Sequence, residues 1–588
     1  MKEPLYALRP VRRRAVECLA VGVDDAEFLD RVERLAEVPY SAVLLSGGTL
    51  DCSRYSIAVS DPFMVFTSKG QTCEVRSSYG TSTVFGEPLD ILEKLCRSLV
   101  PYYGLGGMPF AGGAVGYLAY DLKNRTEELP QTAVDDTHLP DILMFWPLTV
   151  LIHDRRTGIL TQINLDPAGH SLLQDPTCVL QPSKPELPGA AHNDRSGLDR
   201  SARSPMAVGV GSVHMYTADG CSGRSAMIPI SEVRSDNTSS RQEKNSNPSN
   251  TVSRVEKCGR SHPLLARPIK GGEARTVSPG GRGKGEGGPA YFEDPPDFRE
   301  RDHDVPGVDV GSLRSTFSRE GYLDAVEKIR TYIRNGDVYQ VNLSQRFEFP
   351  FAGDPFDLWK GLFQRNPAPF FAFINAGDHQ VLSTSMERFL LRKGSQVETR
   401  PIKGTRKRGA TAAEDEELRD ELANSPKDDA ELSMIVDLLR NDLGRVCQPR
   451  SVRVTEHKRL EAYENVYHLV SIVLGTLRPN VSHLDLIRAT FPGGSITGCP
   501  KIRAMEIIDE LEPVARHVYT GCIGYLGWHD NLDMNIAIRT AVIHRGRGLL
   551  SVGGGVVYDS DPADEYDETL HKGRTFLRLF GHPGEIPS

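Results

Sequence analysis

The sequence of 588 residues lacks the features that mark several large classes of protein. No apolar run approaches the length that crosses a membrane, so no transmembrane segment is expected. The formal net charge of −9 offers no positive field to nucleic acid or to an anionic membrane surface. No internal repeat is visible, which argues against a repeat architecture. The expected partners are therefore small molecules or other proteins, with no nucleic acid and no membrane.

Paired cysteines are also missing. None of the ten cysteines belongs to a CxxC pair, which excludes a zinc knuckle and a thioredoxin-like motif. Reduced thiols fit best, so a cytoplasmic location is expected. Residues 12–14 are arginines, but Glu17 interrupts the apolar stretch that follows, and no signal peptide is predicted. The cysteines stand at Cys18, Cys52, Cys73, Cys96, Cys178, Cys221, Cys258, Cys447, Cys499 and Cys522.

Composition divides the chain into an N-terminal part, a middle segment and a C-terminal part. Residues 1–174 contain short apolar or β-branched runs separated by glycine, proline and aspartate, which is typical of a mostly β domain. Residues 175–312 are rich in serine, glycine, arginine, asparagine and proline, without apolar periodicity. Such a segment buries too little apolar surface to offset its chain entropy, so a disordered insertion is predicted. Residues 313–583 mix helices and strands, which predicts an α+β domain.

The spacing of apolar residues predicts the main elements. Helices are expected at 322–334, which Asn335-Gly336 ends, and at 428–445, 463–477, 500–511 and 563–580. Strands are expected at 42–45, 55–59, 63–67, 113–117, 148–152, 338–347, 370–375, 518–526, 534–543 and 549–557.

The segment Pro401-Ile402-Lys403-Gly404-Thr405 holds a lysine between a proline-stiffened entry and a glycine turn, with no acidic neighbour. A lysine held there loses hydration, which favours a nucleophilic amine. The alternatives are a lysine that binds phosphate or carboxylate, and a solvated surface residue. Glu387 lies sixteen residues before Lys403, so a hairpin could bring an acid and an amine together.

Acidic residues recur at helical spacing on two of the expected helices. Glu431 and Asp442 share a stripe of one helix, and Glu565, Glu568 and Lys572 share a face of the last helix. Two acidic stripes suit Mg²⁺, which takes a few carboxylates and leaves positions for water and an anionic substrate. The alternative is a pair of solvated helix faces held by i,i+4 ion pairs.

Further residues have the chemistry of a ligand site. Arg539 is a cation within an otherwise apolar expected strand, and its carboxylate partner could be the substrate. The glycines 553–555 let backbone N–H groups approach a ligand, although a tight turn is the commoner explanation. His468, on the expected helix 463–477, is more often a core histidine than a catalytic one.

Together these segments resemble the chorismate-utilising enzymes. The carrying segments are 337–344 (DVYQVNLS), Glu387, 401–405 (PIKGT), 437–442 (DLLRND), 491–501 (FPGGSITGCPK), 553–555 (GGG), 564–569 (DEYDET) and, in the N-terminal part, 109–117 (PFAGGAVGY). The resemblance implies a large β-sandwich of antiparallel sheets flanked by helices. Residues 175–312 would be an insertion without a counterpart in the family.

The resemblance also implies a role for each matching residue. Glu431 and Glu568 would hold Mg²⁺. Glu387 would be the general acid that helps the C4 hydroxyl of chorismate depart, and His468 would lie near the ring. The positions that match those holding chorismate are Gly404, Thr405, Tyr525, Arg539, Gly553, Gly554, Gly555 and Lys572.

Two positions separate the reactions within this family. Members that add water use a lysine where this chain has Gln340, and an amide cannot act as that base. Members that form anthranilate typically carry alanine where Lys403 stands. The lysine implies a covalent route, in which its amine adds at C2 as the hydroxyl leaves C4, and ammonia then enters at C4. The expected product is 4-amino-4-deoxychorismate, used for 4-aminobenzoate and folate; the alternative is anthranilate, used for tryptophan.

The ammonia needs a source. The sequence has no G-x-C-x-G segment of a glutaminase, so a separate glutamine amidotransferase subunit is expected as a partner. Ser46 and residues 369–371 fall near the family's tryptophan pocket, but the signature around Ser46 is missing, so inhibition by tryptophan is not expected. Two hypotheses of other classes are a catalytically silent chorismate-binding protein and an insertion that binds nucleic acid. The intact acid and lysine set argues against the first, and the mixed charge of the insertion against the second.

Overall fold

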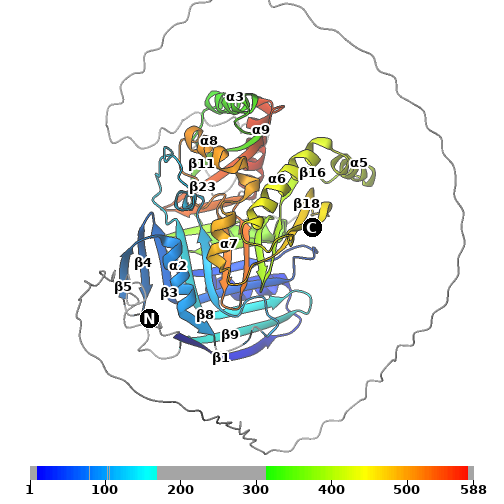
Figure 1. Ribbon diagram of the computed structural model, residues 1–588. Coiled ribbons are helices and arrows are strands. Elements are labelled where there is room, and N and C mark those ends of the chain that lie inside the picture. The colour runs from blue at the N-terminus through cyan, green and yellow to red at the C-terminus, as the bar shows by residue number, and fades with distance from the viewer. Residues whose placement is uncertain (1–8, 79, 102–103, 105, 168–312, 581–588) are drawn as a thin grey trace, which may run out of the picture. The chain divides into compact units, whose positions relative to one another are not determined.

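The computed structural model describes residues 9–78, 80–101, 104, 106–167 and 313–580 (Figure 1). The segment 175–312, for which disorder is predicted, lies outside the described residues. All described residues belong to one compact unit of the chain. None of the helices in these ranges is long and apolar enough to span a membrane.

The N-terminal part is built mainly of strands. Its helices are α1 (Asp25–Ala36) and α2 (Pro88–Ser98). Its strands are β1 (Arg9–Ala20), β2 (Ser41–Leu45), β3 (Tyr55–Lys69), β4 (Thr72–Ser77), β5 (Gly80–Phe85), β6 (Leu99–Pro101), β7 (Gly113–Leu118), β8 (Ile142–Asp154) and β9 (Ile159–Pro167). The strands predicted at 55–59 and 63–67 are halves of β3.

The C-terminal part mixes both kinds of element. Its helices are α3 (Arg319–Asn335), α4 (Pro355–Arg365), α5 (Ala412–Ala423), α6 (Pro426–Gly444), α7 (His483–Thr490), α8 (Lys501–Leu511) and α9 (Pro562–Phe580). Its strands are β10 (Arg314–Ser315), β11 (Gln340–Pro350), β12 (Phe371–Asn375), β13 (His379–Ser383), β14 (Arg388–Lys393), β15 (Gln396–Arg400), β16 (Ile402–Lys407), β17 (Arg453–Ala462), β18 (Val466–Thr476), β19 (Gly498–Cys499), β20 (Cys522–Gly527), β21 (Asn531–Ile536), β22 (Thr540–His544) and β23 (Arg547–Val556).

The two parts share hydrogen-bonded sheets. Strand β2 pairs with β12, and β7 pairs with β20, so each pairing joins residues more than 300 positions apart in the sequence. Among the described strands, every ladder is antiparallel except that of β1 with β6. The predicted α+β fold, with large antiparallel sheets flanked by helices, is confirmed. The domain bounds 1–174 and 313–583 stay a prediction.

The predicted helix 463–477 is wrong. This stretch forms the strand β18, which pairs with β17 on one side and with β15 and β16 on the other. A central strand is buried on both faces, so apolar residues occupy successive positions. The alternation of apolar and polar residues that indicates a strand is therefore missing. The β-branched Val466, Val470, Ile472 and Val473 favour this outcome. His468 therefore projects from a strand.

Two other predictions need correction. The strand predicted at 534–543 is two strands, β21 and β22, separated by a break at Arg539, whose φ is +49°. Thr384 holds the break, because its N–H and its hydroxyl both donate to the carbonyl of Arg539, at 3.0 and 3.1 Å. The glycines 553–555 do not form a turn but lie within β23, opposite Ser344, Leu343 and Asn342 of β11.

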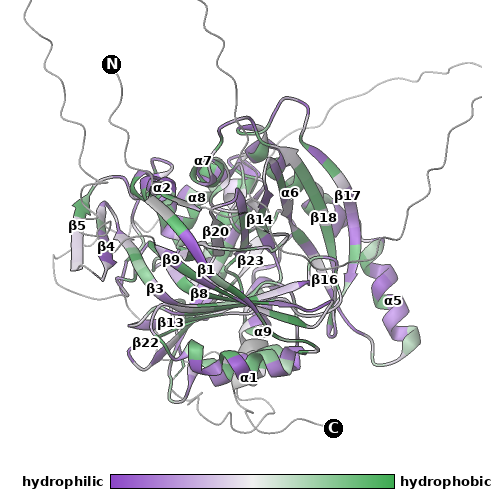
Figure 2. Cartoon of the chain, turned by 90° about the horizontal axis from the view of Figure 1, so that it is seen from below, coloured by the Kyte–Doolittle hydropathy of each residue, from purple (hydrophilic) through white to green (hydrophobic). Residues whose placement is uncertain are grey.

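Capping residues mark the ends of two of the predicted helices. Ser318 caps α3 by accepting from the N–H of Gly321 at 3.0 Å, and Gly336 ends the helix at a φ of +82°. Ser425 caps α6 in the same way, followed by Pro426. Figure 1 shows α3 and α9 at the same end of the fold, where both pack on β11 and β23. Helix α5 is mostly hydrophilic (Figure 2) and has a single buried residue, Leu422.

Candidate active site

A β-bulge presents Lys403. Strand β16 pairs with β18 so that Lys403 lies opposite Leu469 and Thr405 opposite His468, which leaves Gly404 as the extra residue. Gly404 has a φ of +75°, and a β-carbon there would lie 2.9 Å from Cδ1 of Leu422. A bulge redirects the side chains beside it. Glycine follows Lys403 because the bulge needs a positive φ and leaves no room for a β-carbon. The lysine is partly exposed.

Glu387 precedes β14, and the β14–β15 hairpin returns the chain to Lys403, as the spacing predicted. Its side chain is buried, with 4% of its surface exposed. Burial raises the pKa of Glu387 to about 7, against the opposing influence of Ser495, the Lys403 ammonium and the backbone of Ile402. A carboxyl group with a pKa near neutrality can donate a proton at working pH.

The glycine strand β23 lies directly beside Lys403. A β-carbon built on Gly555 would lie 2.2 Å from Nε2 of Gln340 and 3.4 Å from Nζ of Lys403. One built on Gly554 would lie 3.0 Å from Oε2 of Glu565. Glycine at these positions therefore keeps space open beside the lysine and beside the acidic face of α9. Lys572 donates to the carbonyl of Gly553 at 2.8 Å.

Replacement of Gly555 by alanine is expected to lower kcat/KM for the substrate at least tenfold, because the methyl group would displace Gln340 and crowd Lys403. Steady-state kinetics would measure the change. Gly361→Ala on α4 is the matched control, since a methyl group there meets nothing within 4 Å. Equal activity of the two variants would show that the space at Gly555 has no function.

His468 stands next to the bulge. Its Nδ1 lies 3.0 Å from the hydroxyl of Thr405 and donates to the carbonyl of Gly404 at 3.3 Å. Burial lowers the pKa of His468 to about 3, and the charge of Arg539 adds to this effect. The ring is therefore neutral, and its buried Nε2 has no partner among the described residues. A neutral imidazole can orient a substrate group but cannot supply a second proton here.

Arg539 is a cation without a carboxylate. Burial lowers its pKa, with Tyr463 acting in the opposite direction. Within the described ranges no Asp or Glu forms an ion pair with Arg539, whereas Glu568 of the same site pairs with Lys572. A desolvated guanidinium with no acidic partner is suited to bind a carboxylate supplied by a ligand.

Acidic residues of α6 and α9 face the lysines of the site. Burial raises the pKa of Glu431, an effect that Lys403 and Lys427 oppose and Glu568 strengthens. Burial alone would raise the pKa of Glu568, but Lys572, Lys403 and Lys427 bring it below its ordinary value. Lys572 lies 2.6 Å from Glu568, four residues away on α9. The predicted acidic faces of the two helices therefore meet at one site.

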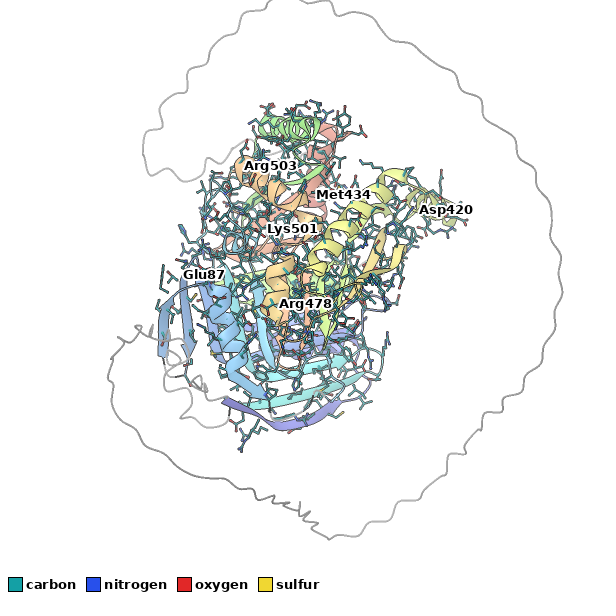
Figure 3. The ribbon with its side chains drawn as sticks, in the orientation of Figure 1. Glu87, Asp420, Met434, Arg478, Lys501 and Arg503 are labelled. Atoms are coloured by element: carbon teal, nitrogen blue, oxygen red, sulfur yellow. The ribbon has the colours of Figure 1, made fainter. Side chains whose placement is uncertain are left out.

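Asp442 does not belong to this acidic group. It pairs with Lys501 of α8 (Figure 3) at 2.5 Å, and Lys501 also donates to the carbonyls of Thr490 and Pro492, both at 2.9 Å. The pair is buried. The pair joins the C-terminal end of α6 to the loop before Ser495. Asp442 therefore has a structural role, although it shares a stripe of α6 with Glu431.

The carboxylates have the chemistry to hold a magnesium ion if a substrate supplied further oxygen ligands. Oε2 of Glu565 is buried without a hydrogen-bond partner in the described part of the chain, and oxygen ligands are those that Mg²⁺ prefers. No three His, Cys, Asp or Glu side chains of the described residues are close enough together to hold a metal ion alone. An ion bound by Glu431 and Glu568 would thus need water and substrate oxygens to complete its shell.

Tyr525 lines a separate cavity, and its assignment to the substrate site stays a prediction. Its ring packs on Phe110 with 4.9 Å between centroids, and it lines a cavity of about 650 Å³ together with Asp51, Arg388 and Asp533. Lys403, Glu387 and Arg539 do not line this cavity.

Other residues of the site carry no strong signal in the sequence. Asn342 and Ser495 are buried. Oδ1 of Asn342 has no hydrogen-bond partner among the described residues, and Ser495 lies close enough to Glu387 to lower the pKa of that carboxyl. Both lie in segments that resemble the family, at 337–344 and 491–501. The only sequence signal for these two residues is that they are small and polar within those segments. Their spacing does not distinguish site residues from residues of the core.

The chain is similar to several known proteins. Residues 294–578 match the family model of the chorismate binding enzymes. The chain is 33% identical to aminodeoxychorismate synthase component 1 of Escherichia coli, over 96% of this chain and 98% of that protein. It is 48% identical to anthranilate synthase component 1 of Pseudomonas putida, over 45% of this chain and 54% of that protein.

A solved structure also matches. The crystal structure of anthranilate synthase component I from Streptococcus pneumoniae aligns with a TM-score of 0.60 at 26% identity, and the alignment covers 90% of this chain and 93% of that chain. The fold and the comparisons define an enzyme of the chorismate-utilising class. The chain belongs to the family of chorismate binding enzymes. Within it, the chain resembles aminodeoxychorismate synthase component 1 along nearly its whole length.

Proposed function

We propose that this protein is the chorismate-converting component of an aminodeoxychorismate synthase, which makes 4-amino-4-deoxychorismate from chorismate and ammonia. The observation that carries the proposal is Lys403 on its bulge beside the glycine strand, close enough to Glu387 for its charge to act on the pKa of that carboxyl. An amine and a carboxylic acid at one open site can exchange one leaving group for another.

The first step makes a covalent bond. The amine of Lys403, which reacts in its unprotonated form, attacks C2 of the ring, both ring double bonds shift by one position, and the C4 hydroxyl leaves as water with the proton of Glu387. Glu387 then takes back a proton from the lysine nitrogen. In the second step ammonia attacks C4, the two double bonds shift back, the bond from C2 to the lysine breaks, and a proton passes from the new ammonium group to the departing amine. The sum is chorismate plus ammonia giving product and water.

The remaining residues would bind and orient chorismate. Arg539 would pair with a substrate carboxylate, since it lacks one of its own. His468 would accept a hydrogen bond at Nε2, and Gly404, Thr405 and the strand 553–555 would pack against the ring. Mg²⁺ at Glu431 and Glu568 would neutralise the charge of a carboxylate during departure of the hydroxyl. Lys572 would fix Glu568 for this purpose.

Ammonia would come from a separate glutamine amidotransferase subunit. The sequence contains no glutaminase motif, and the related proteins are named as a component 1, which implies at least one further component. We therefore expect ammonium salts to support turnover by this chain alone, and glutamine to support it only with the partner present.

The product decides between this proposal and anthranilate formation, which the 48% identity to an anthranilate synthase component over 266 residues keeps as the second candidate. Incubation with chorismate, Mg²⁺ and ammonium chloride is expected to give 4-amino-4-deoxychorismate, with its enolpyruvyl group retained. Liquid chromatography with mass detection separates it from anthranilate. Fluorescent anthranilate as the main product would refute the proposal.

A further inference from the structure

Strand β11 carries two buried amide side chains whose carbonyl oxygens accept no hydrogen bond from the described part of the chain. Gln340 is 1% exposed and Asn342 is 9% exposed. Oε1 of Gln340 and Oδ1 of Asn342 are buried, and no donor reaches either of them from the described residues. Buried amide carbonyls are normally paired, so this arrangement suits a ligand that brings hydrogen-bond donors.

Both amides face the side of the sheet that carries Lys403. They are two residues apart on β11, so their side chains project to the same face. A β-carbon on Gly555 would meet Nε2 of Gln340 at 2.2 Å and Nζ of Lys403 at 3.4 Å, and one on Gly553 would meet Oδ1 of Asn342 at 3.1 Å. The amides and the reactive amine therefore border the same glycine floor.

The two substrates of the proposed reaction differ in what they offer these oxygens. Chorismate carries two carboxylates and an ether oxygen, which are acceptors, and a single hydroxyl donor. Ammonia carries three N–H donors and one lone pair. Two carbonyl oxygens can accept two of these N–H groups and leave the lone pair unshared, as attack on carbon requires.

We propose that Gln340 and Asn342 form the binding site for ammonia and hold it with its lone pair directed at the ring. This inference rests on the proposed function and deepens it. The amides act on the second step alone: the ammonia nitrogen bonds to C4 as the bond between C2 and the Lys403 nitrogen breaks. Formation of the covalent bond to Lys403 does not involve them.

Gln340→Met and Asn342→Leu test the proposal, because each replaces an amide by an apolar group of similar size. With ammonium chloride as the nitrogen source, each is expected to raise the KM for ammonium roughly tenfold, the value of about one hydrogen bond. The KM for chorismate is expected to stay within about twofold. Without ammonium, the adduct on Lys403 is expected to form as in the unaltered protein.

Gln345→Met is the matched control. Gln345 lies on the same strand and is 2% exposed, but it faces the other way, where it donates to Thr569 and accepts from Ser315 at 2.7 Å. This variant should leave both KM values unchanged, and thermal melting would verify the folding of all three. An unchanged KM for ammonium in either site variant, or a rise confined to the KM for chorismate, would overturn the inference. Absence of the C4-aminated product with the unaltered protein would instead overturn the proposed function.

Discussion

Replacement of Lys403 by alanine is expected to reduce the amination of chorismate at C4 at least about thousandfold. The amine forms the covalent bond in the first step, and loss of a nucleophile of this kind removes most of the rate enhancement. The bulge at Gly404 directs Lys403 toward Gly555, where a β-carbon would lie 3.4 Å from its Nζ. Quantification of 4-amino-4-deoxychorismate over time at saturating chorismate and ammonium would measure the loss.

Lys407→Ala provides the comparison for this variant. Lys407 lies on the same strand, but it is exposed and sits 3.5 Å from Glu414 of α5, away from the glycine strand. Its replacement should leave turnover within about twofold, since exposed ion pairs contribute little. If Lys403→Ala retained the rate of Lys407→Ala, the covalent route would be wrong and Lys403 would be a binding residue at most.

Replacement of Glu387 by glutamine is expected to lower kcat by roughly 10² to 10⁴, the range that a general acid contributes. Glutamine fills the same space but has no proton to give to the departing hydroxyl. Rapid-quench measurement of the water-loss step would follow the effect directly. Glu417→Gln on the exposed helix α5 is a control for the charge change, and equal rates for the two variants would remove Glu387 from the mechanism.

The same residue predicts a pH dependence. The carboxyl must be protonated to act, and burial raises its pKa to about 7, so kcat should fall as the pH rises above 7. This descending limb should be absent in Glu387→Gln. The folded state also binds a proton more tightly than the unfolded state, in which the pKa is near its ordinary value of 4.5. The free energy of unfolding should therefore decrease between pH 4.5 and 7, by roughly 3 kcal/mol in total, and the variant should lack this change.

Local signals in the sequence predicted the helices with defined ends. Ser318 and Gly336 cap α3, and Ser425 and Pro426 begin α6, because these residues act through contacts within one helical turn. The site residues Lys403 and Glu387 were also predictable, since a short hairpin joins them. The acidic faces of α6 and α9 were predicted as separate stripes, and the structure brings Glu431 and Glu568 within electrostatic reach.

Features that depend on distant neighbours were not predictable in this way. Strand β18 reads as a helix because both of its faces are buried, and the break at Arg539 depends on Thr384, which lies far away in the sequence. The cavity that Tyr525 lines was also not predictable, because residue type does not reveal which face of β20 a side chain occupies.

Contacts between the two parts of the chain show the same limit. Arg516 lies over the ring of Tyr120 in the N-terminal part, 4.7 Å from its centroid, and pairs with Glu512 at 2.6 Å. Glu512 in turn accepts from the backbone N–H of Ser344 at 2.8 Å. The N-terminal part thus supports β11, the strand that carries Gln340 and Asn342. The sequence pattern of the N-terminal part or of the C-terminal part alone could not predict that Tyr120 contacts the residues that hold β11.

The most direct test is mass spectrometry of the protein held with chorismate and Mg²⁺ in the absence of ammonia. The account predicts an adduct with the mass of chorismate less one water, located on the peptide that contains Lys403 and absent from Lys403→Ala. Addition of ammonium should discharge it as 4-amino-4-deoxychorismate. Turnover of chorismate to this product with no adduct at Lys403, or with an adduct on another residue, would contradict the account.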